Sequence, residues 1–437
     1  MICLPLVLLP LAHAPTLTPP PPTLPAGVTI EQRLVVGMPP GAPLPPILFL
    51  VYGATLVDTI PELDAHLLDV PAAVDLDALI ALLVGSQGAA YAEGDRNSGS
   101  PDTACSQGPG DPWDSAGQQC TIGFADGTPS HKEYKQQSML RQIRAEQAQA
   151  ASTGAPNVVA VIDTGVDLGH PTLAGKLVST GFDYILGVPL AQDAPNFLDD
   201  DGDGTVDEGT GHGTHIAGII VLVNPAAQIL PLRVLDSEGN GWGFDVARAL
   251  VDAGNAGVDI VNLSLALNQH SRVVEDALEH TLGTGAAIFA SAGNHGAAGA
   301  IFPSSHGHVS PPAGTDPCTL PLGGASATGV VSVGAVDPLD SLASFSAFGD
   351  GVDLVTPGVS IYGPDVLLGA QLWSGTSQAT AVASGAASLL LSVNPSLAAS
   401  PALPLILGAD DVSAENPAHP CELGAGRINL QQSLNHL

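Results

Sequence analysis

Short runs of apolar residues, separated by stretches with a helical pattern, recur through the last two thirds of the chain. The runs consist largely of β-branched and small residues, which is typical of strands buried on both faces. They are Val158–Ile162, Ile229–Val234, Ile260–Leu263, Ala287–Ala290 and Val330–Val333. Helical patterns fall between them, for example over Val246–Asn255 and Val273–Leu282. This alternation predicts an α/β fold with a mostly parallel sheet covered by helices on both faces.

The N-terminal part of the chain has a different organisation. Residues 1–14 are mostly apolar and end in small residues, as in a secretory signal, although a buried hydrophobic N-terminus is the alternative. Residues 15–30 are a proline-rich linker, and residues 98–130 are a second linker rich in Gly, Pro, Ser and Asp. Between them, residues 31–97 predict a small α/β domain with strands at Arg33–Val36, Ile47–Tyr52 and His66–Val70 and a helix at Leu76–Leu83. The main domain is then residues 131–437.

Three polar segments stand at the ends of apolar elements. Asp163 follows a predicted strand, at the edge where catalytic groups collect in parallel sheets, although a turn-forming Asp fits equally well. His212 opens a predicted helix within Gly-His-Gly-Thr-His; a metal site formed with His215 would be an alternative, but no HExxH pattern is present. Ser377 opens another buried helix, near the positive end of its dipole. Taken alone, such a serine is an ordinary N-cap.

Together these segments supply an acid, a base and a nucleophile in the order Asp, His, Ser, one of the known orders of convergent triads. Asp163-Thr164-Gly165, His212-Gly213-Thr214-His215 and Gly375-Thr376-Ser377 resemble the signature segments of the subtilisin-like serine peptidases, and the resemblance runs from about Tyr134 to the C-terminus. It implies a three-layer α/β/α domain that hydrolyses peptide bonds in proteins through an acyl-enzyme. Ser377 would be the nucleophile, His212 the base and Asp163 its orienting partner, with His215 structural.

The same resemblance assigns further residues. Asn294 matches the family's side-chain oxyanion donor, although a residue in a Gly-Asn turn is the alternative. Ser264, Leu265 and Ala266 match the strand that pairs with the substrate and lines the first specificity pocket, and Ile301 lies near the segment that closes it. No acidic residue marks these segments, so a basic preference in this pocket is not indicated and medium-sized apolar side chains are expected. Two departures from the family pattern are Gln378 in place of Met and Ala381 in place of Pro.

An acidic loop just before His212 predicts a structural calcium site. It offers oxygen ligands at the alternate positions of an EF-hand-type loop, with the carbonyl of Thr205 among them: Asp199, Asp201, Asp203, Thr205 and Asp207. The Glu expected at the twelfth position is absent, and Thr210 stands there. The alternative is a solvated acidic loop. No catalytic cofactor is expected.

The segment Ala89–Arg96 resembles the end of a subtilase inhibitory propeptide. The resemblance implies a zymogen in which residues 31–97 are an intramolecular inhibitor, whereas an ordinary N-terminal domain is the alternative.

Composition adds to this prediction. A net charge of −32 argues against nucleic-acid binding, which requires a basic face, and no other run is long enough to predict a membrane span. Without Cys3 of the predicted signal, four cysteines remain, for which we prefer the pairs Cys105–Cys120 and Cys318–Cys421 among three possibilities. We therefore expect a secreted monomer, extracellular or periplasmic, that acts on protein or peptide substrates.

Two other functions are compatible with parts of this pattern. A non-catalytic, calcium-dependent binding protein could keep the fold, but such proteins usually lose a member of the triad, and none is missing here. An acid-acting sedolisin-like peptidase has Glu in place of the base, and His212 argues against that class.

Overall fold

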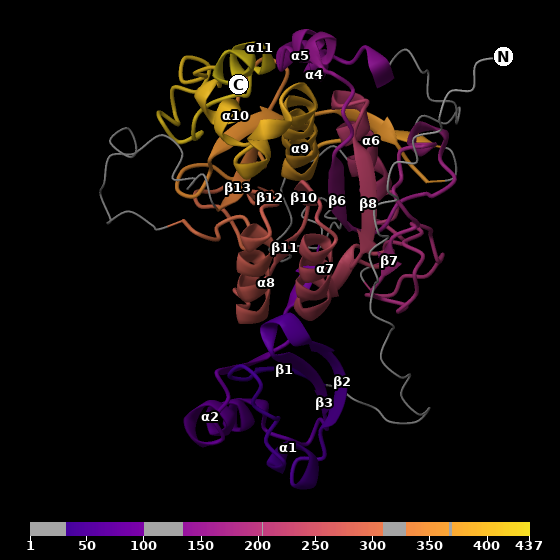
Figure 1. The fold of residues 1–437 in the computed structure, drawn as a ribbon, viewed down its shortest axis with the longest axis vertical. Coiled ribbons are helices and arrows are strands. Elements are labelled where there is room, and N and C mark those ends of the chain that lie inside the picture. Colours follow the sequence, from indigo (N-terminus) through magenta and orange to yellow (C-terminus); the bar gives the residue numbers. More distant parts are fainter. Residues whose placement is uncertain (1–31, 100–133, 203, 309–328, 367–368) are drawn as a thin grey trace, which may run out of the picture.

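The computed structural model describes residues 32–99, 134–202, 204–308, 329–366 and 369–437. A large layered domain carries a smaller sheet unit, formed by the N-terminal residues, at one end (Figure 1). The predicted signal, the proline-rich linker and most of the second linker lie outside the described residues, as do Cys105, Cys120 and Cys318.

The large domain is built on one seven-stranded sheet. All neighbouring strands in it are parallel. In spatial order they are β14 (Leu354–Pro357), β13 (Val330–Val336), β12 (Ala287–Ser291), β10 (Ile260–Leu263), β6 (Val158–Asp163), β8 (Gln228–Arg233) and β7 (Phe182–Asp183). The five strands predicted from apolar runs are therefore confirmed.

Helices cover both faces of this sheet, which confirms the three-layer α/β/α class (Figure 1). On one face lie α6 (His212–Val223) and α9 (Thr376–Val393), and on the other α7 (Gly243–Asn255) and α8 (Arg272–Gly283). Strand residues alternate between the two cores: Val159 and Val161 pack with α6 and α9, whereas Ala160 and Ile162 pack with α7 and α8. This is the period of two expected of a strand buried on both faces.

Smaller elements complete the large domain. Among the short helices, α5 (Ala145–Ala151) packs against α9 and α4 (Ser138–Gln142) packs against α5, whereas α10 (Leu403–Leu407) and α11 (Leu430–Ser433) follow α9 in the chain. Strands β15 (Ile361–Pro364) and β16 (Ala370–Trp373) form an antiparallel hairpin next to α6. Short 3₁₀ turns occur at Pro171–Leu173, Pro395–Ala399 and Leu434–His436, and another at Pro61–Leu63 belongs to the N-terminal unit. Among the described residues, no helix is long and apolar enough to span a membrane.

The N-terminal unit is an antiparallel sheet backed by helix α2 (Leu76–Ser86). Its spatial order is β2 (Thr55–Ile60), β3 (Ala65–Val70), β1 (Gln32–Gly37) and β4 (Tyr91–Gly94). Leu34 and Val36 face its own small core, whereas Val35 and Leu67 belong to the core of α7 and α8. The unit is therefore attached to the large domain by apolar burial.

One predicted strand is wrong. Ile47–Tyr52 was expected to be a strand, but the structure has the short helix α1 (Ile47–Leu50) followed by a turn. Two prolines, Pro45 and Pro46, precede it, and proline favours the first turn of a helix. Leu48 is the only fully buried residue of this helix and Leu50 is 83% exposed, so the apolar run did not reflect a buried strand.

A short strand, β5 (Asn97–Gly99), connects the two units. It lies between β9 (Asn240–Trp242) and β11 (Ala266–Leu267) and pairs antiparallel with both. The predicted linker begins at residue 98, so its first two residues are strand residues instead.

Candidate active site

Three elements of the large domain carry the predicted acid, base and nucleophile. Asp163 is the last residue of β6, His212 the first of α6, and Ser377 lies in the first turn of α9. All three side chains are buried. Both helices therefore begin at the carboxyl edge of the sheet, where their positive dipole ends favour negative charge.

Asp163 and His212 form a direct pair. Nδ1 of His212 lies 2.8 Å from Oδ1 of Asp163, which also accepts a hydrogen bond of 2.7 Å from the backbone N–H of Thr164. A buried carboxylate at Nδ1 fixes the tautomer that leaves Nε2 as the proton acceptor.

Gly213 allows this pair to form. Its N–H donates to Thr164 Oγ1 at 3.0 Å, and a Cβ at this position would lie 2.1 Å from the carbonyl oxygen of Gly165. Any larger residue would push the first turn of α6 away from β6 and hence away from Asp163.

His215 is held as a neutral structural residue. Burial lowers its pKa to about 3, and its Nε2 lies 3.2 Å from the carbonyl oxygen of Ile361. Its ring stacks on that of Trp373, with the two ring centroids 5.5 Å apart. A Cβ on Gly363 would lie 2.6 Å from this ring. The geometry supports His212, rather than His215, as the base.

Ser377 is held by contacts with β10 and the residues after it. Its Oγ lies 3.4 Å from the carbonyl oxygen of Ser264, and Ser264 Oγ donates to the Ser377 carbonyl at 3.1 Å. Behind them, Asn262 donates to Ser264 Oγ and accepts from Ser384 Oγ, each at 2.9 Å. This buried network fixes α9 against the sheet. Trp373 lies just before α9, and the centroids of its ring and the His212 ring are 5.1 Å apart. This contact brings the serine segment beside the histidine.

Asn294 is fixed beside the serine by its side-chain oxygen. Its Oδ1 accepts from the N–H and the Oγ1 of Thr376, at 2.9 and 2.8 Å. Because a backbone N–H can only donate, these bonds identify the oxygen of the amide and turn its NH₂ group to the opposite side. This orientation suits an oxyanion donor next to Ser377.

The predicted substrate-binding residues lie close to Ser377, Asn294 and β5. Ala266 pairs with Gly99 of β5, and Ser264 contacts Ser377. The side chain of Leu265 is buried in the core of α7 and α8, so any contact of this residue with substrate would be made by its backbone. Ile301 packs against Gly293, next to Asn294.

Asp193 was not predicted from the sequence and is buried beside the base. It accepts a hydrogen bond from the N–H of Gly211 at 3.0 Å and one from Thr214 Oγ1 at 2.9 Å, both at the start of α6. Burial raises its pKa to about 7. Its place 19 residues before His212 offers no recognisable spacing, so only the fold reveals it.

The acidic loop is described apart from Asp203. The carboxylate of Asp199 accepts from the N–H groups of Gly202 and Gly204, and that of Asp207 from Asn196 and Phe197. In the part of the chain that the structure describes, no group of three or more His, Cys, Asp or Glu side chains is arranged to hold a metal ion. The calcium site, one of whose ligands lies outside the described residues, stays a prediction, as does the pairing of Cys421.

Comparison with known proteins decides the family. The model of the subtilase family matches residues 154–407, more than half of the chain, and the match includes every proposed catalytic residue. The chain belongs to the subtilase family. As a subtilase it is a serine-type endopeptidase, a hydrolase that acts on proteins.

Individual subtilases agree with this assignment. A thermophilic serine proteinase of Bacillus sp. (strain AK1) is 35% identical over 54% of this chain and 52% of its own length. Thermitase of Thermoactinomyces vulgaris is 31% identical over 58% of this chain and 81% of its own length. Subtilisin BL of Lederbergia lenta is 32% identical over 56% of this chain and 79% of its own length. This chain thus spans about half the length of the first relative and about four fifths of the other two.

Proposed function

We propose that this subtilase is a secreted zymogen whose Asp163–His212–Ser377 triad cleaves peptide bonds through an acyl-enzyme. The observation that carries the proposal is the buried 2.8 Å contact between His212 and Asp163, at the edge of the sheet where α9 presents Ser377. A serine hydroxyl needs such a base to become a nucleophile near neutral pH.

Each residue has a defined part in the proposed reaction. His212 takes the proton of Ser377 Oγ as the oxygen attacks the substrate carbonyl, and later gives it to the leaving amine. Asp163 stabilises the imidazolium formed between these steps. The Asn294 NH₂ group and the Ser377 N–H stabilise the oxyanion, and loss of one such donor costs about 10²–10³ in turnover. The same sequence of steps with water as nucleophile releases the acid product.

Residues 31–97 act as the inhibitory propeptide in this proposal. Support comes from β5, which pairs with β9 and β11 as an extended peptide would. Glu93 adds a second attachment, because its carboxylate accepts from Ser271 Oγ at 2.9 Å and from the N–H of Val273 at 3.2 Å, at the start of α8. Occupation of these strand edges excludes substrate until the segment is cut.

A bound calcium ion would stabilise the loop that leads into α6. The carboxylates of Asp199, Asp201, Asp203 and Asp207 and the carbonyl of Thr205 would hold it, and an all-oxygen set suits this hard cation. Its contribution would be to the position of the base rather than to chemistry.

Substitution of the nucleophile tests the proposed function. Ser377→Ala should abolish both peptide hydrolysis and cleavage between the two units, because it removes the hydroxyl that His212 would activate. Wild-type protein, produced in parallel, should appear as two fragments by N-terminal sequencing. Self-cleavage by purified Ser377→Ala would contradict the triad, and an uncut but active wild type would contradict the zymogen.

A further inference from the structure

We propose that the substrate cleft of this subtilase selects a Lys or Arg side chain at the position that Gly99 occupies in β5. This inference rests on the proposed function, since it requires that substrate replaces β5 between β9 and β11. It concerns a position apart from the first specificity pocket, for which the sequence indicates no basic preference.

The direction of a side chain at this position follows from the pairing of β5. Gly99 lies opposite Asn240 on one side and Ala266 on the other. A Cβ built on Gly99 would lie 3.5 Å from the carbonyl oxygen of Gly239 and 3.9 Å from Oδ1 of Asn240, which are ordinary contact distances. The backbone therefore accepts a side chain here, and that side chain would pass along the turn that carries Asn240.

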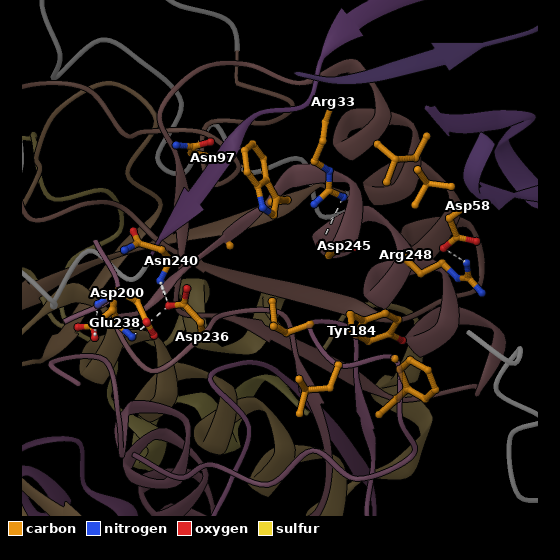
Figure 2. Close-up of a pocket in the computed structure, with 18 of the residues that line it drawn as sticks. Arg33, Asp58, Asn97, Tyr184, Asp200, Asp236, Glu238, Asn240, Asp245 and Arg248 are labelled. Atoms are coloured by element: carbon orange, nitrogen blue, oxygen red, sulfur yellow. Dashed lines mark hydrogen bonds and ion pairs between the residues drawn. The ribbon is translucent and has the colours of Figure 1, made fainter. Parts of the chain in front are cut away.

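Carboxylates surround this turn. Asn240 donates from Nδ2 to Asp201 at 3.2 Å and from its N–H to Asp236 at 2.9 Å. Both aspartates line a cavity of about 870 Å³ together with Asp200, Glu238 and Asn240. Figure 2 shows Asp200, Asp236 and Glu238 gathered around Asn240, while Arg33 and Arg248 lie at the other end with Asp245 and Asp58. Asn97, on the same face of β5 as Gly99, lines this cavity, so a side chain at the Gly99 position would point toward its acidic end.

At this acidic end of the cavity, one carboxylate oxygen of Glu238 lacks a hydrogen-bond donor among the described residues. The residue is 1% exposed, and its Oε1 accepts from the N–H groups of Asp200 at 3.4 Å and Asp207 at 3.2 Å. Its Oε2 is buried without any hydrogen-bond partner in the described structure. A buried carboxylate oxygen left unpaired is costly, and a charge-assisted hydrogen bond removes that cost.

An organic cation fits this requirement better than a metal ion. The described residues around Glu238 provide no group of three metal-ligating side chains, and Glu238 is not among the predicted calcium ligands. An ammonium or guanidinium on a long aliphatic stem can pass Asn240 and place its charge beside the carboxylates. The net charge of −32 would also attract basic peptides, but that long-range effect does not distinguish one substrate position from another.

Cleavage of a peptide mixture randomised at six positions before the cut tests the inference. Reactions contain saturating calcium and low salt, and products are sequenced by mass spectrometry. Wild type should enrich Lys and Arg over Glu by about tenfold or more at one fixed position. Glu238→Gln keeps an oxygen for both backbone N–H groups but removes the charge, so the enrichment should fall several-fold. The control is Glu146→Gln. Glu146 is an exposed residue of α5, in the helix layer on the other face of the sheet from α7, so this substitution removes the same charge and should leave the enrichment unchanged.

Several results would overturn the inference. These are equal enrichment in Glu238→Gln and wild type, enrichment spread evenly over all six positions, or none at all. A thermal unfolding curve for Glu238→Gln verifies that it folds, and Asp200→Asn replaces it if it does not. A fluorophosphonate label on every variant distinguishes failure of the proposed function from failure of the basic subsite alone. Absence of the label in wild type would contradict the proposed function itself, whereas labelled enzyme without enrichment contradicts only the basic subsite.

Discussion

At the scale of single residues, the fold brings Asp163 and His212, each at the end of an apolar element, to 2.8 Å. Their positions are recognisable in the sequence, but the groups that hold the pair are not. Asp193 and Glu238 carried no signal, since a lone acid in a loop becomes informative only when its burial and partners are known. Leu265 matches a family motif by position, but the direction of its side chain, into the core of α7 and α8, is visible only in the structure.

Gln378 is the residue-scale feature with the clearest energetic consequence. It is buried directly after Ser377, and neither Oε1 nor Nε2 has a hydrogen-bond partner in the described structure. Since an unsatisfied buried polar group costs about 1–3 kcal/mol, Gln378→Met should raise the free energy of unfolding by about 1–2 kcal/mol. Urea unfolding in a Ser377→Ala background, which prevents autolysis, measures this.

Gln371 provides the matched control for that substitution. Its amide is satisfied, because it donates to Asp365 and accepts from Trp373 Nε1 at 2.9 Å. Gln371→Met should therefore lower stability. If Gln378→Met proves as destabilising as Gln371→Met, the amide of Gln378 has a partner in solution and the expectation is wrong.

At the scale of elements, the runs of apolar residues predicted the strands that are buried on both faces. The same criterion gave a wrong prediction where a run is only partly buried. The exposed run Ile47–Tyr52 is not a strand, and proline at its start favoured a helical turn. Strand β5 was missed because Asn97-Ser98-Gly99 has no apolar alternation. Its partners, β9 and β11, lie more than 140 residues away in the chain, so only the tertiary structure defines it.

The contact between α6 and β6 makes a prediction at this scale. Gly213→Ala should displace the first turn of α6, lowering stability by about 1–3 kcal/mol as overpacking does, and kcat/KM by more than about tenfold. Gly283→Ala is the control, because a Cβ there meets nothing within 4 Å and alanine favours a helix. Unfolding and peptide hydrolysis measure the two effects. Full activity in Gly213→Ala would contradict the requirement for close approach.

At the scale of the whole molecule, the junction between the two units contains buried carboxyl groups. Burial raises the pKa of Asp95 to about 6 and that of Asp245 to about 7, although Arg33 lowers both. Arg33 lies 2.9 Å from Asp95 and 3.6 Å from Asp245, and Arg248 pairs with Asp58 nearby (Figure 2). The junction therefore binds protons more tightly than the separated units would.

This linkage fixes the direction of a pH effect. A carboxyl pKa that is higher in the complex favours the complex at low pH, and the advantage is lost as pH rises through about 6 to 7. For Ser377→Ala protein cut at an engineered site within residues 100–130, the dissociation constant of the two units should rise at least about tenfold between pH 5.5 and 8. Calorimetry measures it. Asp245→Asn should flatten this dependence, and tighter association at pH 8 would contradict it.

The central claim is that Ser377 is the nucleophile, and one measurement tests it directly. Mature wild-type protein is treated with a fluorophosphonate and digested, and the adduct is located by tandem mass spectrometry. A single adduct on Ser377, absent after His212→Ala because the serine loses its base, is the predicted result. An adduct on another residue, or labelling of Ser377 that does not depend on His212, would contradict the account.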